Sequence, residues 1–374
     1  MKARVALVHD FFVDDGGAER CALELARLFP QAPVFTTFFD RARFGDRLDP
    51  RRVRPWALQR ILGGRRFRSL LPLYPAYFSL LDLRDVPLVV SSSVAFSKAV
   101  RTSRRGLHVS YVHTTMRYGW DLDAYLAGSS YSRAARLAAR TVRAPLIAWD
   151  RRTASRPDVL VANSENVRER IRLRWGRSAE VIHPPVDTAE FSLGADDDGF
   201  LLVAARLLAY RRLDLAVEAA NRLKRELVIV GDGPERARLE RLAGPTVRFT
   251  GHLPRREVVG LFERCHAYLL PGIEDFGIAP VEAMACGRPV VAYRAGGALE
   301  SVVDGATGVL FDRPDVGALA EAIERRDSIA FDPSKLREAA QSFDRANFLS
   351  RWRALLARLG VDAELYDSSD GRLS

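Results

Sequence analysis

The sequence predicts an α/β protein built from two doubly wound, Rossmann-like domains. Short apolar, β-branched runs alternate with longer segments of helical periodicity, which is the pattern of strand–helix units in a parallel sheet. The alternation also begins twice, once at Val5 and again at Phe200, after Asp196-Asp197-Asp198-Gly199, so the two halves join near residues 188–199. The chain of 374 residues is long enough for two domains of ordinary size, each with its own core.

Each predicted element rests either on a short apolar, β-branched run, which predicts a strand, or on helical periodicity, which predicts a helix. In the first half we expect strands over 5–8, 88–90, 109–112 and 159–161, and helices over 18–28 and 165–175. In the second half we expect strands over 200–204, 227–230, 247–249 and 267–270, and helices over 213–223, 235–242 and 256–264. A last helical pattern, 343–359, places Trp352 and Leu355 on one stripe.

Composition narrows the class of protein. The net charge is +10, with 53 Arg against only four Lys, which fits either an anionic partner or a general bias toward arginine. The three Cys show no metal-ligand or redox spacing, so we expect buried free thiols in a reducing compartment. The N-terminus begins a strand at once, and no run of about 18 apolar residues occurs. We therefore expect a cytoplasmic protein.

The segment from Arg51 to Leu81 mixes basic and aromatic or apolar residues. This mixture suits peripheral contact with an anionic membrane surface, here the inner face of the plasma membrane, or with a lipid-linked acceptor. It equally suits an ordinary amphipathic segment that covers the first sheet. The basic members are Arg51, Arg52, Arg54, Arg60, Arg65, Arg66 and Arg68, and the others are Trp56, Leu58, Ile61, Leu62, Phe67, Leu70, Leu71, Tyr74, Tyr77 and Phe78.

The most informative stretch runs from Glu274 to Glu282. A Gly-x-x-Pro step at Gly277 can open a helix, so the first Glu lies in the loop before the helix and the second lies in its first turns. A helix N-terminus offers free backbone N–H groups and a positive dipole end, which favour an anionic ligand such as a diphosphate. An apolar run that reads as a buried strand follows the helix.

This stretch resembles the donor-binding signature of the retaining glycosyltransferases of family 4, which have the GT-B fold. Further similar motifs lie between about residues 5 and 303: 8–10, 16–20, 113–114, 161–164 and 183–187. The resemblance implies a metal-independent enzyme that transfers a hexose from a nucleotide diphosphate to a saccharide or polyprenyl-linked acceptor. The local similarity is to bacterial polysaccharide mannosyltransferases, so GDP-mannose is the favoured donor. A UDP-sugar-dependent transferase of the same fold is the alternative.

The same resemblance implies the domain organisation. An acceptor-side domain spans 1–190, a nucleotide-sugar donor domain spans 191–342, and the segment 343–374 crosses back to the first domain as a C-terminal helix. The donor binds in a cleft between the domains, and no cofactor, metal or nucleic acid is expected.

Charge on the departing diphosphate has to be stabilised without a metal, so arginine or lysine must supply it. Arg206 matches the first basic position of the family motif. Arg211 stands five residues later, where the family usually has Lys. Arginine keeps the charge and can bind two phosphate oxygens at once, although its geometry differs from that of an ammonium group. We expect both arginines to bind the diphosphate.

The first domain contributes a glycine pair and a histidine. Gly16 and Gly17 match the glycine loop of the family, where small residues let the backbone approach a phosphate or sugar. His113 matches a histidine that faces the donor sugar in relatives. It is expected either to orient a sugar hydroxyl or to share charge at the reaction centre.

In the donor motif, the resemblance assigns Glu274 to hydroxyls of the donor sugar and Glu282 to the ribose hydroxyls. Carboxylates accept hydrogen bonds from two hydroxyls at once, so the residue type suits this role. Backbone N–H groups for the sugar and phosphate are expected from Phe276, Gly277, Ile278 and Ala279. The loops 231–234 and 251–254 are weaker candidates for the base pocket, because Gly and Pro also simply punctuate loops.

Other functional readings are weaker. Asp121-Leu122-Asp123 and Asp196-Asp197-Asp198 fit an Asp-x-Asp metal signature, but one opens a predicted helix and the other lies in the linker. A pyridoxal-phosphate phosphorylase needs a lysine, and the second domain has only Lys224 and Lys335. A non-catalytic partner that binds a sugar nucleotide is another alternative. The feature that favours it is Arg211, which replaces the usual Lys of the family.

Overall fold

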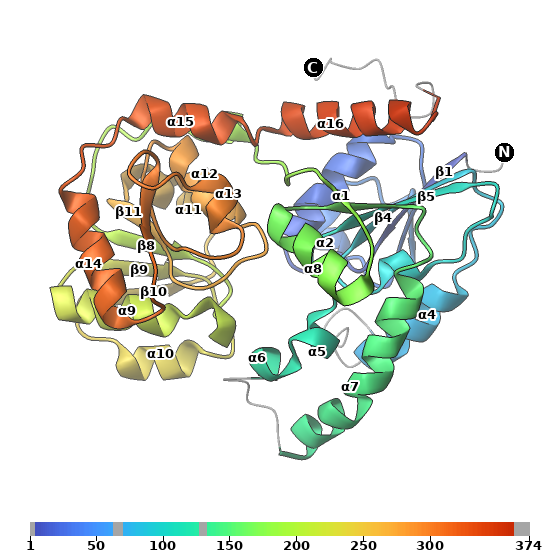
Figure 1. Cartoon of the computed structure of the whole chain (residues 1–374), viewed down its shortest axis with the longest axis horizontal. Helices are drawn as coiled ribbons and strands as arrows, with labels where there is room; N and C mark the ends of the chain where they lie inside the picture. The colour runs from blue at the N-terminus through green and yellow to red at the C-terminus, as the bar shows by residue number, and fades with distance from the viewer. Residues whose placement is uncertain (1–3, 63–69, 127–132, 363–374) are drawn as a thin grey trace. The chain divides into compact units, whose positions relative to one another are not determined.

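A computed structural model describes residues 4–62, 70–126 and 133–362 (Figure 1). The chain divides into two compact units. The first consists of Met1–Trp120, Val142–Pro185 and Ala346–Ser374, and the second consists of Asp121–Thr141 and Val186–Arg345. Each unit is described by itself below.

The first unit is built on a seven-stranded parallel sheet in the order β3-β2-β1-β4-β5-β6-β7. The strands are β1 (Val5–His9), β2 (Val34–Thr36), β3 (Val53–Pro55), β4 (Leu88–Ser93), β5 (Leu107–Val112), β6 (Val159–Ala162) and β7 (Glu180–Val181). The chain proceeds outward from β1 in one direction and then resumes beside β1 with β4. The boundary between β1 and β4 is therefore the point where the strand order reverses.

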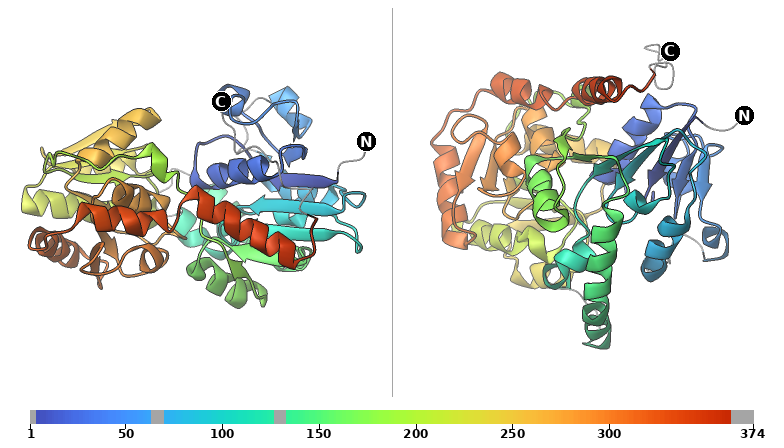
Figure 2. Two further views of the ribbon diagram at one scale, coloured as in Figure 1. Left: turned by 90° about the horizontal axis from the view of Figure 1, so that it is seen from above. Right: turned by 45° about the vertical axis from the view of Figure 1, so that its right-hand side comes forward.

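Helices cover both faces of this sheet (Figures 1 and 2). On one face, α1 (Gly17–Leu28) and the last helix, α16 (Arg345–Arg358), pack against Leu7, Val90 and Tyr111, with Trp352 fully buried among them. On the other face, Val8 and Val89 face a second core. The helices on that face are α4 (Tyr74–Leu80) and α7 (Arg133–Thr153), and α8 (Glu165–Trp175) covers β5 and β6.

The second unit is built on a six-stranded parallel sheet in the order β10-β9-β8-β11-β12-β13. The strands are β8 (Leu201–Ala204), β9 (Leu227–Val230), β10 (Val247–Gly251), β11 (Ala267–Leu270), β12 (Val290–Tyr293) and β13 (Gly308–Phe311). One face packs against α9 (Leu213–Leu223), α10 (Arg236–Leu242) and α14 (Val316–Asp327). The other face packs against α11 (Arg255–Arg264), α12 (Ile278–Ala285) and α15 (Pro333–Gln341).

The fold class predicted from sequence is confirmed: both sheets are parallel, doubly wound and covered by helices. Side chains alternate between the two cores along each strand, because successive residues of a strand point to opposite faces. Leu201 and Val203, for example, face one core of the second unit, whereas Leu202 faces the other. The return of the chain to the first unit through α16 also agrees with the expected C-terminal helix.

The structure adds elements that the sequence pattern did not indicate. The 21-residue helix α7 was not predicted, and it contains Pro145, a residue that normally ends a helix. The short strands β2 and β3 have only three residues each, too few for a periodicity to show. The remaining short helices are α2 (Arg41–Phe44), α3 (Leu58–Leu62), α5 (Arg117–Trp120), α6 (Leu122–Leu126) and α13 (Ala298–Ser301). The predicted division placed residues 121–141 in the first domain, whereas the described residues of this range, 121–126 and 133–141, group with the second unit.

Most apolar residues of the segment from Arg51 to Leu81 are used inside the first unit. Tyr74 and Phe78 of α4 are fully buried, and Leu70 is also buried in the same core. Arg52 donates hydrogen bonds to three carbonyl oxygens, at Ala26, Phe29 and Ala32. These residues cover the sheet, as the ordinary amphipathic interpretation expected. Arg65, Arg66, Phe67 and Arg68 lie outside the described residues.

Candidate active site

The predicted donor residues gather where the strand order of the second sheet reverses, between β8 and β11. Ligands of open α/β sheets bind at the carboxyl ends of strands at such a point, because the connections on either side leave in opposite directions. Arg206 and Arg211 lie in the segment that follows β8, the latter in the 3₁₀ turn η4 (Ala209–Arg211). Glu274 lies in the segment that follows β11.

Arg211 and Glu274 form an ion pair through Nη1 and Oε1. Both side chains are largely buried, and the Arg211 guanidinium also lies 5.7 Å from the centre of the Tyr210 ring. The close approach of the two segments depends on Gly272, because a Cβ at this position would lie 2.6 Å from the Arg211 backbone. The structure thus brings together the predicted diphosphate-binding arginine and the predicted sugar-binding carboxylate.

Arg206 is exposed, and its side chain makes no ion pair or hydrogen bond with any of residues 4–62, 70–126 and 133–362. It lies two residues after the end of β8, at the same end of the sheet as Arg211. The structure therefore leaves its guanidinium accessible to an anionic ligand.

Glu282 is buried on the second turn of α12 and is paired with Arg255, the first residue of α11. Arg255 Nη2 donates to Glu282 Oε1 at 2.8 Å. The same guanidinium donates to both carboxylate oxygens of Glu190, at 2.9 and 2.8 Å, and lies 5.0 Å from the centre of the Phe191 ring. One arginine thus neutralises the buried carboxylate and connects it to the segment that enters the second unit.

Sequence reasoning missed Arg255 and Glu190, although a signal was available. A positive charge in the first turn of a helix is disfavoured by the helix dipole, so Arg255 at this position indicates an anionic partner. The partner itself was not predictable, because Glu190 and Glu282 are 65 and 27 positions away.

The residues from Phe276 to Ala279 form the entry to α12. Gly277 is the N-cap residue with φ of +90°, a conformation that costs other residues energy, and the helix begins at Ile278. Phe276 is buried against Phe343, with ring centres 5.3 Å apart. Gly297 N donates to Glu274 O at 3.0 Å, and a Cβ at Gly297 would lie 2.3 Å from the Phe276 Cα. These contacts fix the backbone before the helix, as a site that uses backbone N–H groups requires.

In the first unit, Gly16 is the N-cap of α1 and Gly17 is its first residue. A Cβ built on Gly16 would lie 2.8 Å from Oε2 of Glu19, so the space beside this glycine adjoins a buried carboxyl group. Burial raises the pKa of Glu19 to about 8, and Asp14 and Asp15 nearby contribute to the increase. Sequence analysis did not single out Glu19, which occupies the helix end that we expected to face a phosphate or sugar.

His113 follows β5 directly and is mostly buried. Its Nε2 lies 2.8 Å from the Ser92 hydroxyl oxygen, and its ring packs edge-on against Tyr111. Burial, with a smaller contribution from His9, lowers the pKa of His113 to about 3. The imidazole is therefore neutral near pH 7.

Asp10 is a further residue of this region without a predicted role. Its carboxylate accepts hydrogen bonds from four consecutive backbone N–H groups, Val94 to Ser97, at 2.6 to 2.9 Å. The segment after β4 is thus shaped around a carboxylate of the chain itself. This cluster of N–H groups resembles an anion-binding nest whose anion is a side chain.

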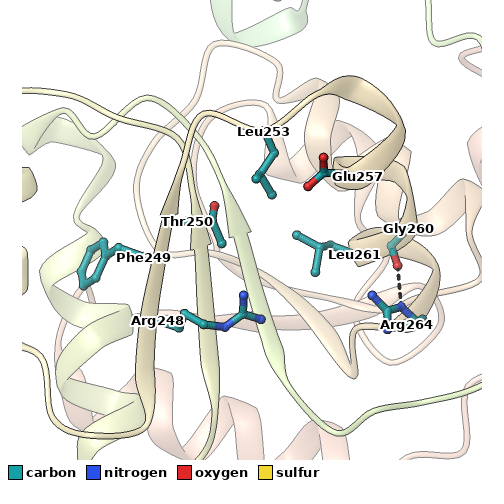
Figure 3. Close-up of a pocket in the computed structure, with 8 residues that line it drawn as sticks. All are labelled: Arg248, Phe249, Thr250, Leu253, Glu257, Gly260, Leu261 and Arg264. Atoms are coloured by element: carbon teal, nitrogen blue, oxygen red, sulfur yellow. Dashed lines mark hydrogen bonds between the residues drawn. The ribbon is translucent and has the colours of Figure 1, made fainter.

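A groove of about 450 Å³ lies in the second unit between the edge strand β10 and α11 (Figure 3). Leu253 belongs to one of the loops that we expected to line a base pocket, and it lines this groove together with Thr250, Glu257 and Leu261. Arg264 lines it as well and donates a hydrogen bond to the carbonyl oxygen of Gly260. None of Arg206, Arg211, Glu274 and Glu282 lines this groove.

Residues 15–190 match the family described as "Glycosyltransferase Family 4", and residues 186–342 match the family described as "Glycosyl transferases group 1". The two matches overlap over residues 186–190 and together cover most of both units. The chain belongs to the GT-B glycosyltransferases of family 4.

Individual relatives of this glycosyltransferase are named for different activities. It is 32% identical over 205 residues to the GDP-mannose-dependent alpha-(1-6)-phosphatidylinositol monomannoside mannosyltransferase of Mycolicibacterium smegmatis, covering 46% of this chain and 54% of the relative. It is 31% identical over 204 residues to the glycogen synthase of Mycobacterium tuberculosis, covering 50% of this chain and 48% of the relative. The chain thus spans about half the length of these curated relatives.

Among solved structures, Anabaena Alr3699/HepE in complex with UDP superposes with a TM-score of 0.68 and 20% identity. The superposition covers 94% of this chain and 100% of that one. At this identity the likeness establishes the fold.

Proposed function

We propose that this glycosyltransferase moves a hexose from a nucleotide diphosphate to a saccharide or lipid-linked acceptor, with retention of anomeric configuration and without a metal. The observation that carries the proposal is the pairing of Arg211 with Glu274 at the reversal point of the donor-domain sheet, with Arg206 following the same strand, β8. Two guanidinium groups there suit a diphosphate, and a carboxylate held next to them suits the hydroxyls of the attached sugar.

Each proposed residue has a separate task. Arg206 and Arg211 stabilise the charge that develops on the departing diphosphate, which is the main requirement of this reaction. Glu274 binds sugar hydroxyls and Glu282 binds the ribose, while the N–H groups at the start of α12 bind phosphate and sugar oxygens. A diphosphate oxygen accepts the proton of the acceptor hydroxyl as that hydroxyl attacks from the face that the diphosphate leaves.

A glycosidase-like use of the two carboxylates fits the structure less well. Such enzymes need one carboxyl group that donates a proton and another that acts as a nucleophile or base. Here both are held by arginines, Glu274 by Arg211 and Glu282 by Arg255. Carboxylates held in this way suit binding and positioning of hydroxyl groups.

Arg206→Ala and Glu282→Ala test the assignment of these residues. We expect Arg206→Ala to lower kcat strongly, and Glu282→Ala to weaken nucleotide binding by about 10- to 100-fold through loss of buried hydrogen bonds. Arg222→Ala and Glu321→Ala, which alter exposed residues of α9 and α14, serve as matched controls. Normal turnover by the Arg206 variant, or normal nucleotide affinity of the Glu282 variant, would remove that residue from the site.

We propose GDP-mannose as the donor and surface polysaccharide as the product. The relative from Mycolicibacterium smegmatis, a GDP-mannose-dependent mannosyltransferase, supports this choice. The complexes of the structural neighbour with UDP and UDP-glucose favour the alternative, a UDP-sugar donor. Thermal-shift titrations with GDP-mannose, UDP-glucose and UDP-N-acetylglucosamine separate the two, because only a bound ligand raises the melting temperature.

A positive shift without any transfer or donor hydrolysis would favour the third reading, a non-catalytic partner that binds a sugar nucleotide. Detection of either reaction in the purified protein would reject it. The assay needs acceptors of several classes, since an unsuitable acceptor also abolishes transfer but leaves slow hydrolysis of the donor.

We also propose cytoplasmic location with peripheral membrane contact through the segment from Arg51 to Leu81. Within the described residues, no helix combines the length and hydropathy needed to cross a membrane. Leu73 and Leu80 at the two ends of α4 are exposed, and the chain is strongly basic. These features support contact with anionic lipid.

Vesicle co-sedimentation tests this contact. We expect binding to vesicles that contain phosphatidylglycerol, and weaker binding after the combined change Leu73→Ser and Leu80→Ser. Leu173→Ser, which alters an equally exposed leucine of α8, is the control. Equal binding of all three proteins would assign the membrane contact elsewhere.

A further inference from the structure

Three buried side chains form a hydrogen-bonded chain across neighbouring strands of the first sheet. His9 ends β1, Ser92 lies opposite it in β4, and His113 follows β5. His9 Nδ1 lies 3.1 Å from both the carbonyl oxygen and the hydroxyl oxygen of Ser92, and the same hydroxyl oxygen lies 2.8 Å from His113 Nε2. The serine hydroxyl is thus the link between the two imidazoles.

The carbonyl oxygen of Ser92 determines the tautomer of His9. A carbonyl oxygen only accepts hydrogen bonds, so Nδ1 of His9 must carry a proton. Burial lowers the pKa of His9 to about 4, which leaves the ring neutral with this single proton. The protonated Nδ1 points at the carbonyl and hydroxyl oxygens of Ser92 together, so the hydroxyl oxygen accepts from His9.

The hydroxyl proton of Ser92 then determines the tautomer of His113. In the part of the chain that the structure describes, the hydroxyl oxygen has only the two imidazoles as hydrogen-bond partners. Because it accepts from His9, its proton is available only to Nε2 of His113. Nε2 is therefore the acceptor nitrogen, and the single proton of the neutral His113 ring lies on Nδ1.

We propose that Ser92 is a positioning residue that fixes His113 as the Nδ1–H tautomer, so that His113 offers a neutral N–H donor to an oxygen of the sugar substrate. This inference rests on the proposed function, which places His113 at the donor sugar. It decides between the two roles expected from the sequence: His113 orients the sugar through a hydrogen bond and does not share charge at the reaction centre.

The first arm of the test reads the tautomer directly and needs no activity. The full-length protein is labelled with ¹⁵N at histidine. Long-range NMR correlations between the ring nitrogens and the carbon-bound ring protons then distinguish protonated from unprotonated ring nitrogens. The chain has six His, so single substitutions assign the signals of His9 and His113. We expect protonated Nδ1 and unprotonated Nε2 in both. A wild-type His113 protonated at Nε2 would overturn the proposal.

The second arm uses Ser92→Ala with a matched control. Ser91, the preceding residue of β4, forms the equivalent contact with a different imidazole, because its hydroxyl oxygen lies 2.9 Å from Nε2 of His108. We expect Ser92→Ala to move the His113 proton toward Nε2 and Ser91→Ala to leave His113 unchanged. An unchanged His113 tautomer in a folded Ser92→Ala protein overturns the proposal. Ser92→Thr, which keeps the hydroxyl, should keep the wild-type tautomer.

The kinetic arm separates this inference from the proposed function. With the donor that the protein accepts, Ser92→Ala should lower kcat/KM by about 10- to 100-fold, mostly through kcat, and Ser92→Thr should restore most of it. Full activity of a Ser92→Ala protein with an altered tautomer would overturn the positioning role. If the wild-type protein turns over no nucleotide sugar, the proposed function fails, whereas the tautomer assignment is still decided by the NMR arm.

Discussion

Replacing Arg255 by methionine tests how the second unit stabilises the buried carboxylate of Glu282. The variant keeps most of the aliphatic stem but removes the guanidinium donors that reach the Glu282 and Glu190 side chains. The Glu282 side chain is only 7% exposed, so water replaces the lost hydrogen bond poorly. The Glu190 side chain is 38% exposed, so water largely replaces the hydrogen bonds that Glu190 loses.

The magnitude follows from this difference in exposure. Removing one partner of a fully buried ion pair costs about 3–5 kcal/mol. Arg255 is itself 27% exposed, which lets some water enter, so we expect about 2–3 kcal/mol of destabilisation. The control Glu190→Gln should cost under about 1 kcal/mol. The double variant Arg255→Met and Glu282→Met should regain much of the loss, since replacing both partners of a buried pair by apolar groups is often nearly neutral.

The assay has to report on the second unit. All five Trp of the chain (Trp56, Trp120, Trp149, Trp175 and Trp352) lie in the first unit, so tryptophan fluorescence does not follow α12. Hydrogen exchange of peptides from Ile278–Ala285 does, and 2–3 kcal/mol corresponds to about 30- to 150-fold faster exchange if the helix opens with its unit. Unchanged exchange in Arg255→Met would refute the reasoning, because the carboxylate would then not depend on this arginine.

Three further predictions concern other parts of the molecule. Gly272→Ala should reduce nucleotide affinity in calorimetric titrations, because the new Cβ would lie 2.6 Å from the Arg211 backbone and displace it. Gly260→Ala should not, because a Cβ there meets no described atom within 4 Å outside the backbone of its own helix. Lys98→Met should cost about 3 kcal/mol in urea unfolding followed by tryptophan fluorescence, because it leaves the Asp150 carboxylate, 2.6 Å from Lys98 Nζ and fully buried, without its cation. Burial, aided by Arg156, lowers the pKa of His108 from 6.5 to about 3, so the unfolded state binds a proton below pH 6.5 that the folded state does not. Stability therefore falls as the pH falls from about 6.5, and His108→Gln should make unfolding free energies less steep by about 1.4 kcal/mol per pH unit in that range. A parallel pH dependence in variant and wild type would contradict this assignment.

The sequence alone determined the fold class. Short β-branched apolar runs predict the strands of a doubly wound sheet, and the helical periodicity of the apolar residues predicts the helices. It also predicted the loop before a helix at Glu274, Gly277 and Glu282, since their spacing depends on one local turn and the helix after it. Elements that lack a clear periodicity in the sequence were not predicted. The strands β2 and β3 are too short to show a period, and α7 contains a proline that its surroundings tolerate.

Only the tertiary structure decided which charges and hydrogen bonds meet. Arg211 reaches Glu274 across 63 positions because β8 and β11 are neighbours in the sheet, and Gly272 lets their loops approach. Arg255 finds Glu190 and Glu282 because α11 and α12 pack on one face. The tautomer of His113 depends on a serine 21 residues away. Local periodicity follows from neighbouring residues, whereas partners of buried polar groups are set by strand order and by the packing of distant elements.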